Sequence, residues 1–391
     1  MLAILAVVQI PFIYRRYVLG KRFDQIARIQ SQRAAAADPD FAEYKGNIHV
    51  HTSLGGHSTG GFDELIAAAN SNGLDFVVMT EHYSENYDTA ALTLNGVFGK
   101  TLFVGGNEID TADSDRFFML PGGKDATGFR FEHTDNVLSK IHSEKGFAMI
   151  AYPEKFRSWG SAFDGIEVFN LKTMAKSANP VTLILDAVWS GYSYPDLMFA
   201  DHLKRPDANL KQFDEIASTR RISMFGGTDG HSNIGLHVFG TDTGGKLLNI
   251  KIDPYETTFR IVRMHILLPK DVPLTRESLI DAIGKGSYFT GFDTFGDSTG
   301  FRFVGTAGTQ TVRQGGEVPF SGDLSLRAAS PVPARMVFYK NGEKFGEQAD
   351  TAEFVVKPDG PGVYRVELYQ DALGDTASKM PWIVSNPIYV R

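Results

Sequence analysis

Three of the ten histidines in this chain lie within nine positions, in the segment NIHVHTSLGGHS at 47–58. If its first residues form a strand, His49 and His51 point to the same face, because side chains alternate along a strand. His57 follows in a glycine-rich turn that can bend back over that face. Clustered imidazoles cost stability unless something uses their lone pairs, and a divalent metal ion is the usual user. The segment therefore predicts a metal site.

Other short apolar runs also end in ionisable residues. These are Glu81 and His82, Glu108, and Asp229 with His231. The carboxyl ends of strands are where α/β folds build active sites, so we expect these side chains to meet at one rim. Together with the first three histidines they supply enough ligands for two metal ions. Glu81 is expected to turn away from the metals, because its neighbour His82 points the other way on an extended strand.

The elements that would position these residues alternate between strands and helices from Lys45 to about Gly240. This alternation predicts a mainly parallel sheet or a barrel. The expected strands are 46–51, 75–82, 101–108, 147–154, 164–170 and 221–231, and the expected helices include 62–73 and 134–146.

The pattern changes after Gly245. We expect a strand at 255–268 and a helix at 274–291 closed by Gly286. From about Phe301 onward, short β-rich segments are separated by turns, including an Asn341-Gly342 hairpin signal. This part predicts a small β-sandwich at 299–391, following an α/β unit at 45–298.

The composition of the chain excludes several kinds of partner, metal ligand and nucleophile. The chain has 391 residues, of which 42% are hydrophobic and 22% charged, as in an ordinary globular protein. Its net charge of -7 argues against nucleic acid as the main partner. The absence of cysteine excludes disulfides, thiolate ligands and cysteine nucleophiles. Any transition metal must therefore be held by histidines and carboxylates.

Five motifs together resemble one known family. They are HVH (49–51) with His57 six residues on, TEH (80–82), GGNE (105–108), AYPE (151–154) and GGTDGHS (226–232). The set is similar to the polymerase and histidinol phosphatase (PHP) superfamily and covers about residues 45–232 in the family's order. The resemblance implies a distorted (β/α)7 TIM-like barrel that binds two or three ions of zinc, manganese or iron and hydrolyses mostly phosphoesters. The remainder resembles the C-terminal Ig-like sandwich of longer bacterial members, including the carbaryl-hydrolase-like metallohydrolases.

Carried over by residue, the resemblance implies two sets of metal ligands. The first set is His49, His51, Glu108 and Asp229, and the second is His57, His82 and His231. A third ion would need a histidine where this chain has Tyr152, and no histidine lies in the stretch 116–123. A neutral tyrosine is a poor ligand, so we expect two divalent ions unless Glu154 or Asp110 substitutes.

The implied function is that of a phosphoesterase in which bound metals activate a hydroxide. His82, Asp229 and His231 would take catalytic roles, and Tyr152, Lys155 and Arg157 would contact a small anionic ester. The Lys-Arg pair also fits a solvated loop. Two alternatives stay open. The first is hydrolysis of a carboxyl ester, carbamate or amide, because a binuclear site also polarises a carbonyl group. The second is a degenerate binding module, because Tyr152 stands where the family has a metal-binding histidine. The oligomeric state is left open.

The N-terminus predicts a membrane anchor at 1–22 and a helical stalk at 23–44 that ends at Pro39. The first 14 residues are apolar apart from Gln9. They fall short of the roughly 20 residues that span a bilayer, although an extension to Leu19 with Arg15 and Arg16 snorkelling would nearly suffice. The basic residues that follow the apolar run favour a cytoplasmic location for the folded domain. Relatives that carry the sandwich are often exported, however, and we therefore expect the domain on the extracytoplasmic side.

Overall fold

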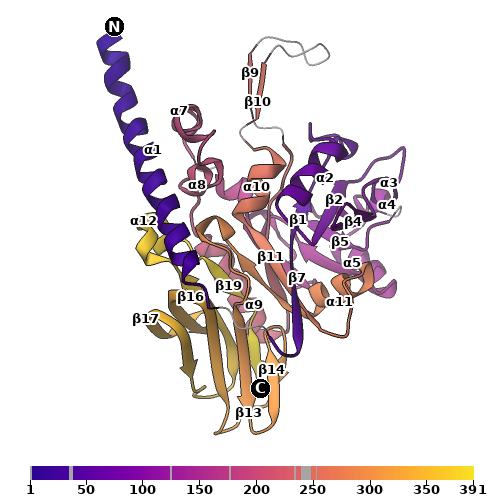
Figure 1. Ribbon diagram of the computed structural model, residues 1–391. Helices are drawn as coiled ribbons and strands as arrows, with labels where there is room; N and C mark the ends of the chain where they lie inside the picture. The colour runs from indigo at the N-terminus through magenta and orange to yellow at the C-terminus, as the bar shows by residue number, and fades with distance from the viewer. Residues whose placement is uncertain are drawn as a thin grey trace.

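The computed structural model describes residues 2–34, 38–123, 126–175, 178–232, 235–238, 248–251 and 253–391. Its strands form one hydrogen-bonded network of 18 strands and a separate two-stranded ribbon, β9 (Gly235–Val238) with β10 (Leu248–Lys251). Helices cover the part of the sheet built by the first half of the chain, whereas from Tyr288 onward the regular structure is mostly strand (Figure 1). The predicted mixed α/β class is confirmed.

The first half of the sheet carries the strands that the sequence predicted. They are β1 (Phe41–Val50), β2 (Phe76–His82), β4 (Thr101–Asp110), β6 (Phe147–Ile150), β7 (Gly165–Asn170) and β8 (Ser223–Gly227). Neighbours pair in parallel from β1 to β2 to β4 and from β6 to β7 to β8. The sequence did not predict β5 (Arg116–Leu120), which lies antiparallel between β4 and β6, or the short β3 (Gly96–Phe98).

Barrel closure is not seen among the described strands, because no ladder pairs β8 with β1. The hydrogen bonds that β1 makes on this side come from the residues just after β8. The Thr228 amide donates to the Ile48 carbonyl at 3.1 Å, and the His51 amide donates to the Gly230 carbonyl at 3.0 Å. An isolated parallel bridge joins Val50 to Gly230. These contacts bring the chain after β8 beside the histidines that end β1.

The helices connect these strands. They are α2 (Phe62–Ser71), α3 (Thr89–Leu92), α4 (Ala126–Phe129), α5 (Thr134–Ser143), α6 (Leu171–Ala175), α7 (Pro180–Ser190), α8 (Pro195–Ala200), α9 (Asp207–Thr219), α10 (Tyr255–Ile261) and α11 (Arg276–Lys285), with short 3-10 turns η1 (Ser53–Gly55) and η2 (Pro153–Lys155). As predicted, α11 ends at Gly286, which has a φ of 68°.

The segment 255–268, predicted to be a single strand, is instead a helix followed by a strand. Helix α10 begins after Pro254, and β11 (Arg263–Pro269) pairs antiparallel with β1. Tyr255 and Phe259 lie one helical turn apart and are both buried in the cluster that contains Leu65 of α2. Burial on one helix face therefore overrides the apparent alternation of this segment.

The chain from Tyr288 onward continues the same sheet. Its elements are β12 (Tyr288–Gly291), η3 (Asp293–Phe295), β13 (Arg302–Ala307), β14 (Gln310–Arg313), β15 (Glu317–Val318), β16 (Ser325–Lys340), β17 (Glu343–Val356), β18 (Gly362–Tyr369), η4 (Asp371–Leu373), α12 (Asp375–Lys379), β19 (Ile383–Ser385) and β20 (Ile388–Val390). The predicted Asn341-Gly342 turn joins β16 to β17, with φ of 50° and 85° at the two residues. Strand β12 pairs with β19, and Phe169 and Trp382 belong to one buried core.

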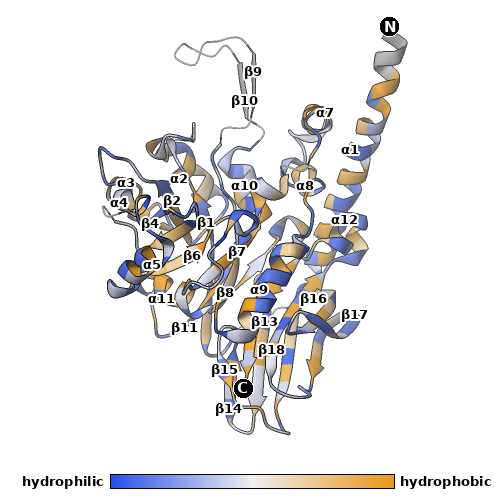
Figure 2. Cartoon of the chain, turned by 180° about the vertical axis from the view of Figure 1, so that it is seen from behind, coloured by the Kyte–Doolittle hydropathy of each residue, from blue (hydrophilic) through white to orange (hydrophobic). Residues whose placement is uncertain are grey.

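The N-terminal helix corrects the predicted membrane anchor. Helix α1 (Leu2–Ser31) is continuous, and none of the helices among the described residues is long and apolar enough to cross a membrane. Figure 2 shows hydrophilic and hydrophobic residues mixed along it. Arg15 pairs with Asp186 at 2.8 Å, and Arg22, buried, donates to the Leu373 carbonyl at 3.0 Å. The predicted membrane-spanning anchor is therefore wrong, and two of its arginines bind protein groups.

The predicted stalk at 23–44 also differs from the structure. Its first part continues α1 as far as Ser31, and β1 already begins at Phe41, on the other side of Pro39. Residues 35–37 of this segment lie outside the described part of the chain.

Candidate metal centre

Histidines and carboxylates from β1, β2, β4 and the segment after β8 meet at one end of the sheet. Two groups of three side chains have ligand atoms that all lie within 4.8 Å of one another: His51, His82 and His231, and His49, His51 and Glu108. Asp229 joins them, with Oδ1 3.4 Å from Nε2 of His49 and 3.8 Å from Nε2 of His51. The predicted convergence therefore holds for six of the seven candidate ligands.

The backbone that presents these groups is unusual at two points. His49 has a φ of 67° and Asp229 a φ of 47°, in the left-handed region that residues other than glycine seldom adopt. The register between β1 and β2 also shifts between Ile48 and Val50. Simple alternation is therefore not the reason that the His49 and His51 rings come together, with centroids 5.0 Å apart. The two rings come together as predicted, but not through the regular alternation that the sequence suggested.

Several buried ligand atoms at this point make no hydrogen bond within the described part of the chain. They are Nδ1 and Nε2 of His51, Oε1 of Glu108, which faces Arg116 at 3.1 Å, and Oδ1 of Asp229, which faces Nδ1 of His231 at 3.1 Å. Nε2 of His51 lies 3.0 Å from Oε2 of Glu108, but without hydrogen-bond geometry. Buried polar atoms without partners are costly. A divalent cation would satisfy these atoms, so the donor set fits a metal ion.

Glu108 is the carboxylate shared by the histidines. Its Oε2 lies 3.2 Å from Nε2 of His49 and 3.8 Å from Nε2 of His82. Burial raises the pKa of Glu108, but its close contacts with His49 and His51 outweigh burial and hold that pKa well below its usual value. Glu108 is therefore an anion that can bridge ligand groups.

Burial also keeps two imidazoles neutral. It lowers the pKa of His51 to about 3 and that of His82 to about 4. A neutral imidazole is the form that binds a metal. Burial likewise lowers the pKa of His49, but the charges of Glu167 and Asp229 outweigh it and raise that pKa well above its usual value.

Glu167, on β7, was missed by the sequence reasoning. Its Oε1 lies 2.6 Å from Nδ1 of His49, and its Oε2 accepts a hydrogen bond from Asn170 at 2.8 Å. A carboxylate on the far nitrogen of a ligand histidine fixes the ring's tautomer and orientation. The only signal was a single acid inside the apolar run GIEVFN. Glu81 behaves as predicted: its carboxylate turns away and accepts from the Thr52 amide at 3.0 Å.

Tyr152 contacts the cluster through a carboxylate. Its hydroxyl donates to Oδ2 of Asp229 at 2.6 Å, and its φ is 54°. Burial, followed by the charges of Glu108 and Asp229, raises the tyrosine pKa far above its usual value. The side chain is therefore a neutral donor, held against a candidate metal ligand.

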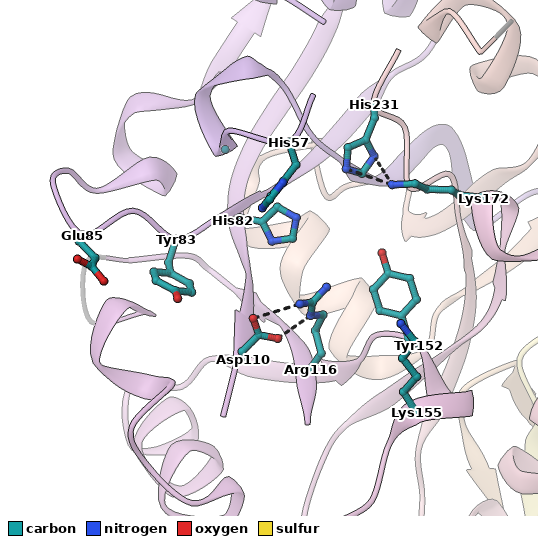
Figure 3. A pocket seen from close by; sticks show the side chains of 11 residues that line it. His57, His82, Tyr83, Glu85, Asp110, Arg116, Tyr152, Lys155, Lys172 and His231 are labelled. Atoms are coloured by element: carbon teal, nitrogen blue, oxygen red, sulfur yellow. Dashed lines mark hydrogen bonds and ion pairs between the residues drawn. The ribbon is translucent and has the colours of Figure 1, made fainter. Parts of the chain in front are cut away.

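An open cavity of about 600 Å³ lies against the cluster (Figure 3). Its walls include His57, His82 and His231, and the cations Arg116, Lys155 and Lys172. His57 is exposed and belongs to neither ligand group, although its ring centroid lies 4.9 Å from that of His82. Arg157, predicted to contact substrate, is exposed and does not line this cavity.

Two of these cations were not predicted. Arg116 lies 3.1 Å from Oε1 of Glu108 and forms two hydrogen bonds to Asp110, at 2.6 and 3.1 Å. Lys172 lies 3.5 Å from Oδ1 of Asp229 and 3.2 Å from Nδ1 of His231. Asp110 is thus paired with an arginine, and Glu154 is exposed on η2, so neither joins the ligand groups.

Comparison with known proteins adds little to this geometry. No protein-family profile and no curated protein sequence matches the chain. Among solved structures, PsfC from Pseudomonas syringae PB-5123 is 14% identical, with a TM-score of 0.37, over 61% of this chain and 88% of that one. This likeness is too distant to carry an argument about fold or function.

Proposed function

We propose that the chain is a metal-dependent hydrolase of phosphoesters, related to the PHP superfamily. One observation carries the proposal: imidazoles and carboxylates from four separated segments converge, and several of their buried ligand atoms make no hydrogen bond within the described part of the chain. The backbone contacts between β1 and the residues after β8 support a distorted barrel of the PHP kind. We further propose a C-terminal Ig-like sandwich beginning near residue 299.

The two ligand groups suit two divalent ions, of zinc, manganese or iron. His49, His51, Glu108 and Asp229 would hold one, and His82 and His231 the other, with His57 closing over it from the exposed turn. When bound, such ions supply Lewis acidity and a water of lowered pKa. Arg116 and Tyr152 already occupy one oxygen each of Glu108 and Asp229, which favours two ions over three.

Three cations in the cavity favour a phosphoester over a neutral carboxyl ester, carbamate or amide. Arg116 and Lys172 flank the cluster and would bind the phosphoryl oxygens as charge develops on them. Hydrolysis forms a bond from the water oxygen to phosphorus, breaks the bond from phosphorus to the leaving oxygen, and transfers one proton of the water to that oxygen. We assign the delivery of this proton to Lys172, whose Nζ lies 3.2 Å from Nδ1 of the proposed metal ligand His231.

The test measures metal content and activity together. The full chain, loaded with zinc or manganese and freed of excess ion, should hold about two ions by mass spectrometry and should hydrolyse phenyl phosphate. His51→Ala, which removes a member of both groups, should lose ions and activity. Because His51 is buried, Asp229→Asn serves as a second variant of nearly unchanged shape. Fewer than one ion per chain in loaded wild-type protein would overturn the proposal.

A further inference from the structure

A second cavity adjoins the one at the metal cluster. We call the cavity against the histidines the inner cavity, and its neighbour, of about 340 Å³, the outer cavity. The two share four lining residues: Asp110, Arg116, Tyr152 and Lys155. The other walls of the outer cavity, among them Thr111, Ser114 and Phe156, carry no charge. A substrate held at the cluster therefore has room to extend past Arg116 and Tyr152.

The three cations that line the two cavities differ in how closely a carboxylate pairs with them. Arg116 is neutralised by Asp110 at 2.6 Å and faces Glu108 at 3.1 Å. Lys172, in the inner cavity, lies 3.5 Å from Asp229. Lys155 is exposed and has no ion-pair partner within the described part of the chain.

Lys155 belongs to the wall that the two cavities share, beside Tyr152. Its Nζ lies over the Tyr152 ring, 5.5 Å from the ring centre. Figure 3 shows Lys155 near the backbone end of Tyr152, whereas Lys172 lies toward the hydroxyl end. Apart from the Asp110–Arg116 pair, the outer cavity thus combines uncharged walls with one lysine that has no ion-pair partner among the described residues.

We propose that the enzyme prefers phosphomonoesters whose leaving group carries a second anionic group, and that Lys155 binds this group in the outer cavity. The inference rests on the proposed function, because it places the scissile phosphoryl group at the metal cluster. Lys155 acts here as a specificity-determining residue. An exposed ion pair of this kind is worth roughly five-fold in binding.

The test compares phenyl phosphate with 4-carboxyphenyl phosphate. The ratio of their kcat/KM values is measured for each protein, so the different reactivities of the two esters cancel between proteins. Lys155→Ala should lower the preference for the carboxylated ester by roughly five-fold, and Lys155→Glu should lower it further. Arg157→Ala removes an exposed cation two residues away that lines neither cavity, and should keep the wild-type ratio.

A binding measurement tests the anion contact of Lys155 independently of hydrolysis. Phenylphosphonate and 4-carboxyphenylphosphonate cannot be hydrolysed, and calorimetry should show the same Lys155-dependent ratio of Kd values. Hydrolysis of both esters with equal ratios in wild type and Lys155→Ala would overturn this inference alone, as would an equal fall in Arg157→Ala. No hydrolysis, together with a Lys155-dependent ratio for the phosphonates, would overturn the proposed function and support the anion contact.

Discussion

The carboxylate of Glu167 lies 2.6 Å from Nδ1 of His49, which leaves Nε2 of the same ring facing Glu108 and Asp229. Glu167→Gln removes this negative charge while nearly keeping the shape of the side chain. Metal affinity should fall by roughly 10–100-fold, because the ring loses the partner that fixes its tautomer and raises its basicity. A competition titration with a chelator measures the change.

Glu277→Gln is the matched control for this prediction. Glu277 is exposed in the first turn of α11, away from the cluster, so its substitution should leave metal affinity unchanged. Equal affinities in Glu167→Gln and wild type would show that Glu167 does not orient His49.

Individual residues differ in how far the sequence could reveal them. His49, His82 and Asp229 stand at the ends of apolar runs, where a fold with strand C-termini at one rim predicts them. Arg116 could not be found in this way, because it stands at the beginning of a strand, β5, and not at its end. Glu167 reads as an isolated buried acid until the fold places it beside His49.

At the scale of elements, a buried histidine joins β1, β11 and η3. Nδ1 of His265 lies 2.8 Å from Oε1 of Glu43, and Nε2 lies 3.4 Å from Oδ2 of Asp293. Burial lowers the pKa of His265, but the charges of Asp293 and Glu43 outweigh it and raise that pKa to about 9. The pair of carboxylates thus stabilises a buried imidazolium.

This raised pKa predicts how stability depends on pH. Its contribution is fully present below the unfolded-state pKa of about 6.5 and is lost as the pH rises through about 9, with a magnitude of roughly 3 kcal/mol. Urea unfolding should therefore give a lower free energy at pH 10 than at pH 7, and His265→Gln should show a smaller decrease. If that variant does not fold, NMR titration of the wild-type imidazole gives its pKa directly, and a value near 6.5 would contradict the prediction.

Helix α11 offers a second test at this scale. The Thr275 hydroxyl accepts from the Ser278 amide at 3.2 Å, and the Ser278 hydroxyl accepts from the Thr275 amide at 2.9 Å. Thr275→Ala should lower the free energy of unfolding by about 1 kcal/mol, because the cap of the helix is lost. Thr275→Ser keeps the hydroxyl and should stay close to wild type in the same urea titration. Equal losses in both variants would assign the effect to the threonine methyl group instead.

Three helices show why the sequence predicted some elements and not others. The helix at 276–285 carries a capping box and a terminal glycine, and was expected. Helix α10 was not, because seven residues are too few to separate a helical period from alternation, and its apolar face becomes evident only against α2. The N-terminal apolar run was long enough to suggest an anchor, but the ion pairs of Arg15 and Arg22 with distant residues cannot be inferred from one sequence.

At the scale of the whole molecule, the half that bears the metal cluster is joined to the β-rich half by buried charges. Arg365 of β18 is almost fully buried and donates to both carboxylate oxygens of Asp214 on α9, at 2.8 and 2.7 Å. It also pairs with Glu367, to which Arg205 contributes two further hydrogen bonds, at 3.1 and 2.7 Å. The sequence pattern predicted an α/β part and a β-rich part. It could not predict the contact between Arg365 and Asp214, because the two residues lie about 150 positions apart.

Arg365→Met should lower the free energy of unfolding by roughly 3–5 kcal/mol, because it leaves the carboxylate of Asp214 without its buried partner. Adding Asp214→Asn should restore part of the loss, since the amide carries no charge to leave uncompensated. Chemical denaturation of the single and double variants measures both effects. If Arg365→Met is too unstable to purify, Arg365→Lys keeps the charge but loses the paired hydrogen bonds, and should still be less stable than wild type. A single variant within 1 kcal/mol of wild type would mean that the two halves are held together by the shared β12–β19 ladder and the common core, with little contribution from this ion pair.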